Sequence, residues 1–343
     1  DLHSTSRRQR QMCIRDRLRM YPEGYTVVNV VDLESYVKGV IPSEVPSSYG
    51  MEALKAQAVC ARSYAYIQMM HNKYEAYGAH VDDSVNFQVY NKQNQTPETV
   101  AAVDETKGQV LSYKGDIIET YYYSTSYGHT GDYEAWNLDK DAYGYLQGVW
   151  VRSEENPIDL SDEKSFLDYI SNVDSACYEA DLKYFRWNTV LDFQGKDETL
   201  LHTIADRKEH QPEAISYYKD ASKTEKTDSC SNFGSLQAIK VVKRNQSGVI
   251  LELELDFQNG AVSVQSEYNM RAILGCGITN INLLDGSSVE MSILPSAYIS
   301  IQAKGDGTYA VLGGGYGHGI GMSQNGAQKP VSYTHLRAHE TKA

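Results

Sequence analysis

Alternation between apolar and polar residues predicts a strand followed by two helices near the start of the chain. Residues 26–31 (TVVNVV) have the β-branched composition of a strand. Asp32 fits the N-cap of a helix that should end within residues 39–42, where glycine and proline follow. In residues 48–71, small and apolar side chains recur every three or four positions, which is the period of a helix. Glu44 lies between the two predicted helices and is expected in a turn.

A hairpin is predicted in residues 108–123, which alternate in strand fashion around Gly115-Asp116 as the turn. This hairpin leads into a polar loop at residues 124–130. The loop is rich in hydroxyl groups and carries one histidine, so it is a candidate for contact with a polar ligand.

Strand patterns return in residues 236–257 and 261–274. Their turns are expected at residues 247–248 and 259–260, where serine or asparagine precedes glycine. A last strand follows Tyr309 and opens into a glycine-rich end.

The middle of the chain, residues 153–230, is richer in charge and weaker in apolar period, apart from a helical pattern at residues 162–173. We interpret it as an inserted or covering subdomain. The expected fold class is α+β, a β-rich mixed fold with helices flanking an open substrate cleft. The predicted divisions are 1–17 and 330–343 as artefacts, 18–152 as the catalytic region, 153–233 as the insertion and 234–329 as the C-terminal half of the main domain.

Both termini resemble translated sequencing adapters rather than protein, namely residues 6–17 (SRRQRQMCIRDR) and 331–343 (VSYTHLRAHETKA). We therefore expect the natural start and finish to be missing. A signal peptide or membrane anchor upstream of Leu18 would have been lost with them. No run of about 20 apolar residues remains in the chain, so no membrane-spanning segment is predicted within it.

The chain is acidic, with a formal net charge of −13. The adapter-like ends carry a net +4, because residues 1–17 hold five Arg against two Asp and residues 331–343 hold one Arg and one Lys against one Glu; the remainder carries −17. Nucleic acid is excluded as the main partner, because phosphate binding needs clustered Lys and Arg. A neutral or locally cationic partner fits better.

Four cysteines lie outside the adapter-like ends, and no CxxC spacing suggests a zinc ribbon or a redox pair. Cys60 falls within a predicted helix and is expected to be buried. Cys177 and Cys230 could pair in an oxidising compartment, but free thiols are the favoured prediction.

Candidate chemistry gathers around Glu44. Lys55 and Arg62 are seven residues apart on the second predicted helix and should project in nearly the same direction, toward one groove. The alternative is a solvated charged face, which is common on surface helices.

The glycine-rich end lacks the GK[ST] ending of a phosphate loop. Its glycines should let the backbone pass close to something bulky, with His318 and Gln324 as hydrogen-bond partners. The histidines form no HxH or HExxH spacing, and no metal ligand set is predicted. The 27 tyrosines, among them Tyr145, supply aromatic faces that suit sugar rings, although sheet packing also uses them.

Five segments together resemble the SpoIID/LytB family, that of stage II sporulation protein D. They follow the family's order along nearly all of residues 25–328. They are LESYVKGVIPSEVPSSYGMEALKAQAVCARSYA (33–65), NFQVY (86–90), AVDETKGQVLSYKGDIIETYYYSTSYGHT (102–130), EYNMRAILG (267–275) and GGGYGHGIGMSQNGA (313–327).

The resemblance implies a bacterial enzyme outside the cytoplasm, in the cell wall or anchored in the membrane and facing the wall. It would cleave peptidoglycan glycan strands, stripped of stem peptides, as a lytic transglycosylase, and a cell-wall amidase would be its partner. Glu44 matches the family's PSE glutamate and is the expected catalytic residue. The residues expected to bind substrate are Lys55, Arg62, Ser126, His129, Tyr145, His318 and Gln324.

A lytic transglycosylase needs one carboxyl group that first protonates the glycosidic oxygen and then accepts the proton of the muramic acid C6 hydroxyl. Glycosidases that use water typically need two carboxylates. Glu44 must hold its proton near neutral pH, which burial against Ile41 or Val45 would favour. We predict that Arg62 contacts the substrate rather than Glu44; a Glu44–Arg62 ion pair would instead indicate a structural salt bridge.

Ser126-Tyr127-Gly128 departs from the Cys-Gly-Gly or Ser-Gly-Gly of many members, some of which bind zinc through that cysteine, so no cofactor is expected here. Phe87 likewise replaces a frequent cysteine. Two other functions remain open. One is a non-catalytic wall-binding module that stimulates an amidase, and the other is a metal-dependent hydrolase using His129 and His318. The physiological setting could be sporulation, vegetative wall turnover or an effector role.

Overall fold

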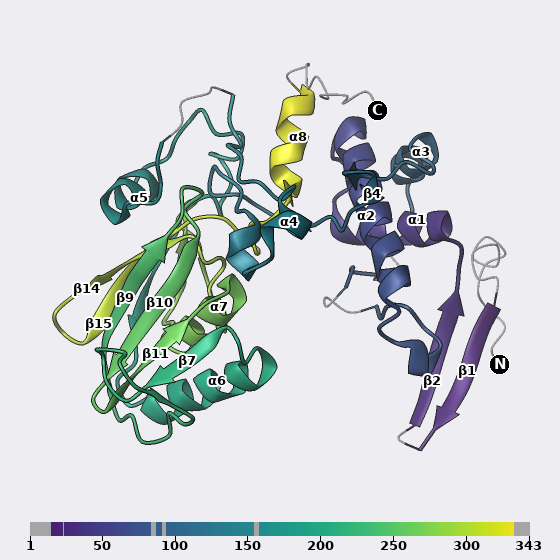
Figure 1. The fold of residues 1–343 in the computed structure, drawn as a ribbon. Helices are drawn as coiled ribbons and strands as arrows, with labels where there is room; N and C mark the ends of the chain where they lie inside the picture. The colour runs from purple at the N-terminus through teal and green to yellow at the C-terminus, as the bar shows by residue number, and fades with distance from the viewer. Residues whose placement is uncertain (1–14, 23, 84–86, 91–93, 154–157, 333–343) are drawn as a thin grey trace. The chain divides into compact units, whose positions relative to one another are not determined.

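A computed structural model describes residues 15–22, 24–83, 87–90, 94–153 and 158–332. The chain folds into two compact units, one formed up to Tyr121 and from Pro330 onward, the other by Tyr122–Lys329. Helices and strands are mixed in an α+β fold, as the sequence predicts (Figure 1).

The first unit is built on three helices that pack on one another: α1 (Leu33–Glu44), α2 (Met51–His71) and α3 (Pro97–Glu105). Caps fix where two of them begin. Asp32 accepts a hydrogen bond from the Ser35 N–H at α1, and Thr96 forms a capping box with Thr99 at α3. The core between the helices consists of fully buried small and branched side chains, namely Val37, Val40, Ile41, Leu54, Ala58, Ala61, Ala102 and Val103.

The prediction that the first helix ends within residues 39–42 is wrong. Helix α1 continues through Pro42 to Glu44, and Val45 closes it by donating its N–H to the Ile41 carbonyl at 3.0 Å. Pro42 has no backbone N–H, so the helix loses one hydrogen bond near its end. Burial of Val40 and Ile41 is kept. Glu44 therefore belongs to the last turn of α1 instead of a loop.

The strands of the first unit are β1 (Arg15–Tyr21), β2 (Gly24–Val30), β3 (Ser112–Tyr113) and β4 (Asp116–Ile117). Strand β1 includes residues 15–17, which the sequence had set aside, and pairs antiparallel with β2. The β3–β4 turn lies at Lys114-Gly115, one residue earlier than predicted. Both residues have positive φ, 53° and 95°, as a type I′ hairpin turn requires. A short 3₁₀ helix (Glu75–Tyr77) follows α2.

The second unit contains two five-stranded antiparallel sheets, ordered β8-β7-β11-β10-β9 and β13-β12-β6-β15-β14. A parallel pair, β5 and β16, joins the start of the unit to its end. The strands are β5 (Tyr122–Tyr123), β6 (Trp187–Asp192), β7 (Ile215–Tyr218), β8 (Lys226–Thr227), β9 (Leu236–Arg244), β10 (Ile250–Phe257), β11 (Gly260–Val264), β12 (Ile281–Leu283), β13 (Ser288–Val289), β14 (Ile299–Ala303), β15 (Thr308–Gly313) and β16 (Met322–Ser323).

Helices border these sheets, and α6 lies beside β7 (Figure 1). Helix α5 begins after the Asp162 N-cap, within the segment predicted to be helical. The helices are α4 (Lys140–Tyr143), α5 (Glu163–Ile170), α6 (Asp197–His210), α7 (Glu267–Gly275) and α8 (Gln324–Ser332), with a 3₁₀ helix at Tyr133–Trp136.

The strand predicted over residues 261–274 is only half correct. Strand β11 ends at Val264, and α7 follows with Met270, Ile273 and Leu274 fully buried in the core. Ile273 and Leu274 lie three and four positions after Met270. An apolar run this short fits the period of a strand or of a helix, and tertiary packing selects the helix.

Residues 153–230 supply β6 to the middle of one sheet and β7 and β8 to the other. They therefore share a hydrophobic core with residues 236–313. The predicted limits at 152 and 233 remain predictions. Residues 1–14 and 333–343 of the adapter-like ends lie outside the described residues. All four described cysteines are free thiols, and Cys60 is buried, as predicted.

Candidate functional site

Glu44 is half-buried at the C-terminal end of α1. Its Oε1 accepts a hydrogen bond of 2.8 Å from the Val89 N–H. The partial negative charge of the helix end and the Val89 N–H donor therefore lie beside this carboxyl group.

Two tyrosines, Tyr36 and Tyr64, lie within electrostatic reach of this carboxyl. The Tyr36 ring stacks on Tyr90 with centroids 5.6 Å apart. Burial raises the pKa of the Tyr36 phenol, and the neighbouring Tyr64 and Glu44 act in the same direction. Burial also raises the pKa of Tyr64, with contributions from Glu119 and Glu44. Both phenols therefore stay neutral and can act as hydrogen-bond donors within electrostatic reach of Glu44.

A buried polar stripe runs along α2 and was missed by the sequence analysis. Gln57, Ala61, Tyr64 and Gln68 are spaced four, three and four residues apart, so they share one helix face. Gln88 donates from Nε2 to the Ala61 carbonyl at 3.2 Å, and the next residue along the chain holds Glu44. Gln88 thereby links α2 to the segment that holds Glu44. The helical period of these polar positions was the signal that could have found it.

Gln57 is 1% exposed, and neither of its amide atoms has a hydrogen-bond partner among the described residues. An unmet buried amide destabilises a fold by about 1–3 kcal/mol. We expect Gln57→Met, which keeps the shape, to raise the unfolding free energy of the first unit by about that amount in urea denaturation. Gln57→Glu is the opposite control and should lower it. A Met variant that is less stable would contradict the prediction.

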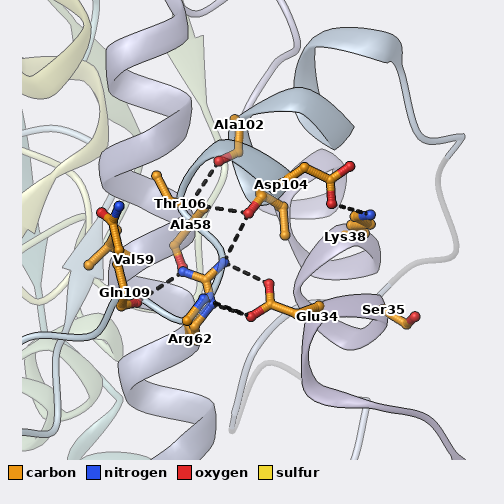
Figure 2. Close-up of polar contacts among 12 residues, drawn as sticks. Glu34, Ser35, Lys38, Ala58, Val59, Arg62, Ala102, Asp104, Thr106 and Gln109 are labelled. Atoms are coloured by element: carbon orange, nitrogen blue, oxygen red, sulfur yellow. Dashed lines mark hydrogen bonds and ion pairs between the residues drawn. The ribbon is translucent and has the colours of Figure 1, made fainter.

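Arg62 lies in the interior, 1% exposed, instead of facing a groove. Its Nε and one terminal nitrogen donate to the two oxygens of Glu34 at 2.9 and 2.8 Å. Its remaining donors reach the carbonyls of Gln109 and Val103 (Figure 2). Every described contact of the guanidinium is internal, and substrate binding by Arg62 stays a prediction. Its ion-pair partner among the described residues is Glu34, not Glu44.

Lys55 lies on the same side of α2 as Arg62, two turns earlier, and remains partly exposed. Its ammonium is 2.8 Å from Glu52 and 2.7 Å from Glu105. Lys55 could exchange these surface partners for a ligand, whereas Arg62 is held inside the fold.

In the second unit, Ser126 is buried together with Glu179. The Glu179 carboxylate accepts hydrogen bonds from the Ser126 N–H and hydroxyl and from the Ser323 hydroxyl at 2.8 Å. It thereby ties the 124–130 loop to the end of the glycine-rich segment. Sequence reasoning missed Glu179, because it lies in the segment with the weakest pattern.

Burial raises the pKa of Glu179 from 4.5 to about 7, against the effect of its hydroxyl donors. Since the folded protein holds this proton more tightly than the unfolded chain, stability is fullest below pH 4.5 and falls as the pH rises to about 7. We expect a loss of about 3 kcal/mol across this window. The measurement compares the wild type with Glu179→Gln, which lacks the titration, in urea denaturation at each pH. A difference between them that does not vary with pH would contradict the prediction.

The two predicted histidines have structural contacts. His318 donates from Nε2 to the Tyr122 carbonyl at 3.0 Å and accepts the Ile320 N–H at Nδ1. Burial lowers its pKa to about 4. His129 donates from Nδ1 to the Thr130 carbonyl, and burial lowers its pKa to about 4 as well. Both rings are therefore neutral.

Tyr145 is half-buried beside Tyr143, with ring centroids 6.1 Å apart. Gln324 begins α8, and its Nε2 has no hydrogen-bond partner among the described residues. Within the described ranges, no three His, Cys, Asp or Glu side chains are arranged to hold a metal ion. Of the predicted residues, Glu44, Lys55 and Arg62 belong to the first unit and the remaining five to the second.

Two family models match the chain. The model described as Stage II sporulation protein matches residues 21–113, which hold Glu44 and α2. Along the sequence, 306 residues are 28% identical to the amidase enhancer of Bacillus subtilis (strain 168), and 136 residues are 37% identical to its stage II sporulation protein D. The chain thus contains a SpoIID domain over residues 21–113.

The second model, described as Domain of unknown function (DUF8618), matches residues 129–321. It covers more than half of the chain, which therefore belongs to that domain family. The match corresponds closely to the second structural unit.

The similarity to the amidase enhancer covers 85% of this chain and 37% of that protein. The similarity to stage II sporulation protein D covers 36% and 39%. An uncharacterised protein of Brachyspira hyodysenteriae (strain ATCC 49526 / WA1) is 41% identical over 130 residues, which are 38% of this chain and 34% of that protein. The chain thus spans between a third and two fifths of the length of these relatives.

No helix in the described ranges of this protein has the length and apolar character needed to cross a membrane.

Proposed function

We propose that this protein acts on the bacterial cell wall and cleaves peptidoglycan glycan strands as a lytic transglycosylase. The SpoIID domain and the similarity to the amidase enhancer support the cell-wall role. A location outside the cytoplasm, facing the wall, follows from that role.

The observation that carries the catalytic part is the setting of Glu44. Its carboxyl lies at the negative end of α1, one oxygen is fixed by the Val89 N–H, and two partly buried tyrosines lie within electrostatic reach. One oriented carboxyl that can hold or release a proton supplies general acid and general base in turn.

In the proposed reaction, Glu44 donates its proton to the glycosidic oxygen as the bond to C1 of muramic acid breaks. The C6 hydroxyl of the same sugar then attacks C1, and the Glu44 carboxylate accepts the hydroxyl proton. The products are a 1,6-anhydro-muramic end and a free hydroxyl on the leaving sugar. Neither water nor a cofactor is consumed.

Two further carboxylates, Asp82 and Glu119, also raise the pKa of Tyr64. Both already accept hydrogen bonds, Asp82 from the Tyr74 hydroxyl at 2.8 Å and Glu119 from the Gln68 amide. A hydrolytic glycosidase would need one of them to activate water or form a covalent bond. Their engagement in the fold favours the route that needs Glu44 alone.

Product analysis tests the proposal. The purified protein is incubated with glycan strands from which the stem peptides have been removed, and the products are examined by mass spectrometry. We expect 1,6-anhydro-muramic ends, whereas reducing muramic ends would indicate hydrolysis. Unchanged strands would exclude catalysis on this substrate.

Amidase enhancement is the second candidate function. It is favoured by the similarity to the amidase enhancer, which covers both structural units. In this case the chain would bind glycan and raise the rate of a wall amidase without altering the strand. Adding the protein to an amidase assay, with Glu44→Gln as a matched variant, separates the functions: enhancement that survives the substitution does not depend on Glu44 chemistry.

The proposed substrate contacts are Lys55, Tyr145 and Gln324. Ser126, His129 and His318 are proposed to shape the surrounding backbone, since their polar atoms are engaged in internal hydrogen bonds.

A further inference from the structure

The second unit has a groove that involves none of the candidate site residues described above. It lies between α6, the end of β7 and residues 228–231, and encloses about 590 Å³. From α6 it is lined by Glu198, Leu201, His202, Ala205, Lys208 and Glu209. These positions repeat every three or four residues, so the groove follows one face of the helix.

The floor of the groove is apolar and belongs to the core. Tyr217 and Cys230 are 4% and 3% exposed, and Leu201 and Ala205 pack partly buried against the same cluster. On the other side of α6, Leu200 and Ile204 are fully buried and hold the helix on the sheet. The groove is therefore a fixed feature of the fold.

Exposed carboxylates flank this floor. Glu198 and Glu209 lie at the two ends of the α6 face and Asp228 on the opposite wall. Within the described part of the chain, none of the three is in an ion pair. They form an acidic rim over an apolar floor.

The cation of the groove is turned inward. The Lys208 ammonium donates to the carbonyls of Pro212 at 3.0 Å and Ile215 at 2.6 Å. It also lies 5.3 Å from the centre of the Tyr217 ring. Because its ammonium makes these contacts, Lys208 does not neutralise the outward carboxylates, which can pair with an incoming partner.

We propose that the α6 groove, defined by the α6 face and residues 228–231, is a docking site for a basic amphipathic helix of a partner protein. Apolar side chains of that helix enter the floor while its Lys or Arg side chains pair with the acidic rim. The α6 face from Glu198 to Glu209 extends about 17 Å at 1.5 Å per residue, which is three turns of helix-on-helix contact. A glycan offers no cations to this rim, and an acidic partner would be repelled.

This proposal is independent of glycan cleavage, so the two can fail separately. The probe is a fluorescein-labelled synthetic helix of Leu and Lys arranged on opposite faces. Its controls are a Leu/Glu helix and a Ser/Lys peptide. Binding to the full chain is followed by fluorescence anisotropy, and glycan cleavage is assayed on the same preparations.

We expect the Leu/Lys helix to bind and both control peptides to bind at least about tenfold more weakly. The rim variant Glu198→Lys/Glu209→Lys/Asp228→Lys should lose at least about tenfold in affinity. The matched control reverses three exposed carboxylates outside the groove, Asp141→Lys/Asp168→Lys/Glu290→Lys, and should keep its affinity at the same net charge. Glycan products should not change in either variant.

Filling the groove tests the floor. Ala205→Phe occupies it from the helix, and Ser231→Phe occupies it from an exposed wall position that tolerates the larger side chain. Both should weaken the Leu/Lys helix.

If the rim and control variants lose the same affinity for the Leu/Lys helix, overall charge explains the loss and the proposal is overturned. Undiminished binding by both filled variants, strong binding of the Ser/Lys peptide or no binding at all would also overturn it. A dimer of the free chain that the filled variants dissociate would assign the groove to a second copy instead.

Discussion

Glu44→Gln is expected to remove the 1,6-anhydro-muramic product, lowering its rate of formation by about 10²–10⁴-fold, the usual contribution of a general acid–base group. The amide oxygen can still accept the Val89 N–H, so the fold should be retained. The measurement is mass spectrometry of peptide-free strands after timed incubation.

Glu98→Gln is the matched control for this substitution. Glu98 is an exposed carboxyl on α3 of the same unit, and its replacement removes the same charge without touching the site. It should leave product formation unchanged. Undiminished product from Glu44→Gln would remove Glu44 from the chemistry, and the proposed mechanism would then be wrong.

Glu34→Ala is expected to destabilise the first unit by about 3–5 kcal/mol, because it leaves the buried Arg62 guanidinium without its counter-charge. The Glu34 side chain is 20% exposed and that of Arg62 is 1% exposed, so the guanidinium left behind is poorly accessible to water. Figure 2 shows the two side chains facing one another. In urea denaturation, we expect the unfolding midpoint of the first unit to fall. The midpoint of the second unit should not change, because that unit does not contain the pair.

Lys55→Ala serves as the control, because its ion pairs lie at the surface and should contribute little. The pH dependence offers a second check. Burial alone would raise the pKa of Glu34, but hydrogen bonds from Arg62 and the Gly108 N–H lower it below 4.5. The contribution of the pair is thus present above pH 4.5 and lost as the pH falls through the lowered pKa. Equal stability of Glu34→Ala and wild type would mean that α1 and α3 do not depend on this pair.

The difference between Arg62 and Lys55 shows where sequence reasoning ran out. A spacing of seven residues correctly places the two side chains on one side of α2, but it does not tell which of them other elements will cover. Arg62 is covered, and the Val103 carbonyl of α3 accepts from its guanidinium at 3.3 Å. Lys55 meets Glu105 at the end of α3 and stays partly exposed. One of the two charged positions therefore serves packing.

The position of Glu44 shows the same limit at shorter range. Gly39 and Pro42 are ordinary signals for the end of a helix, and the sequence was interpreted in that way. Burial of Val40 and Ile41 between α2 and α3 outweighed the single hydrogen bond lost at Pro42. That one extra turn moved Glu44 from a loop to the negative end of α1.

The sequence by itself determined the α+β class, the N-cap at Asp32, the strand pairs β3–β4, β9–β10 and β10–β11, and the family resemblance through its motifs. These features depend on contacts between residues near one another in the chain. Only the tertiary structure decided the partners of the charged groups, since Glu34 meets Arg62 across 28 positions, Val89 meets Glu44 across 45 and Ser126 meets Glu179 across 53. Such pairs are fixed when helices and strands pack together, and local periodicity carries no information about which segments will meet.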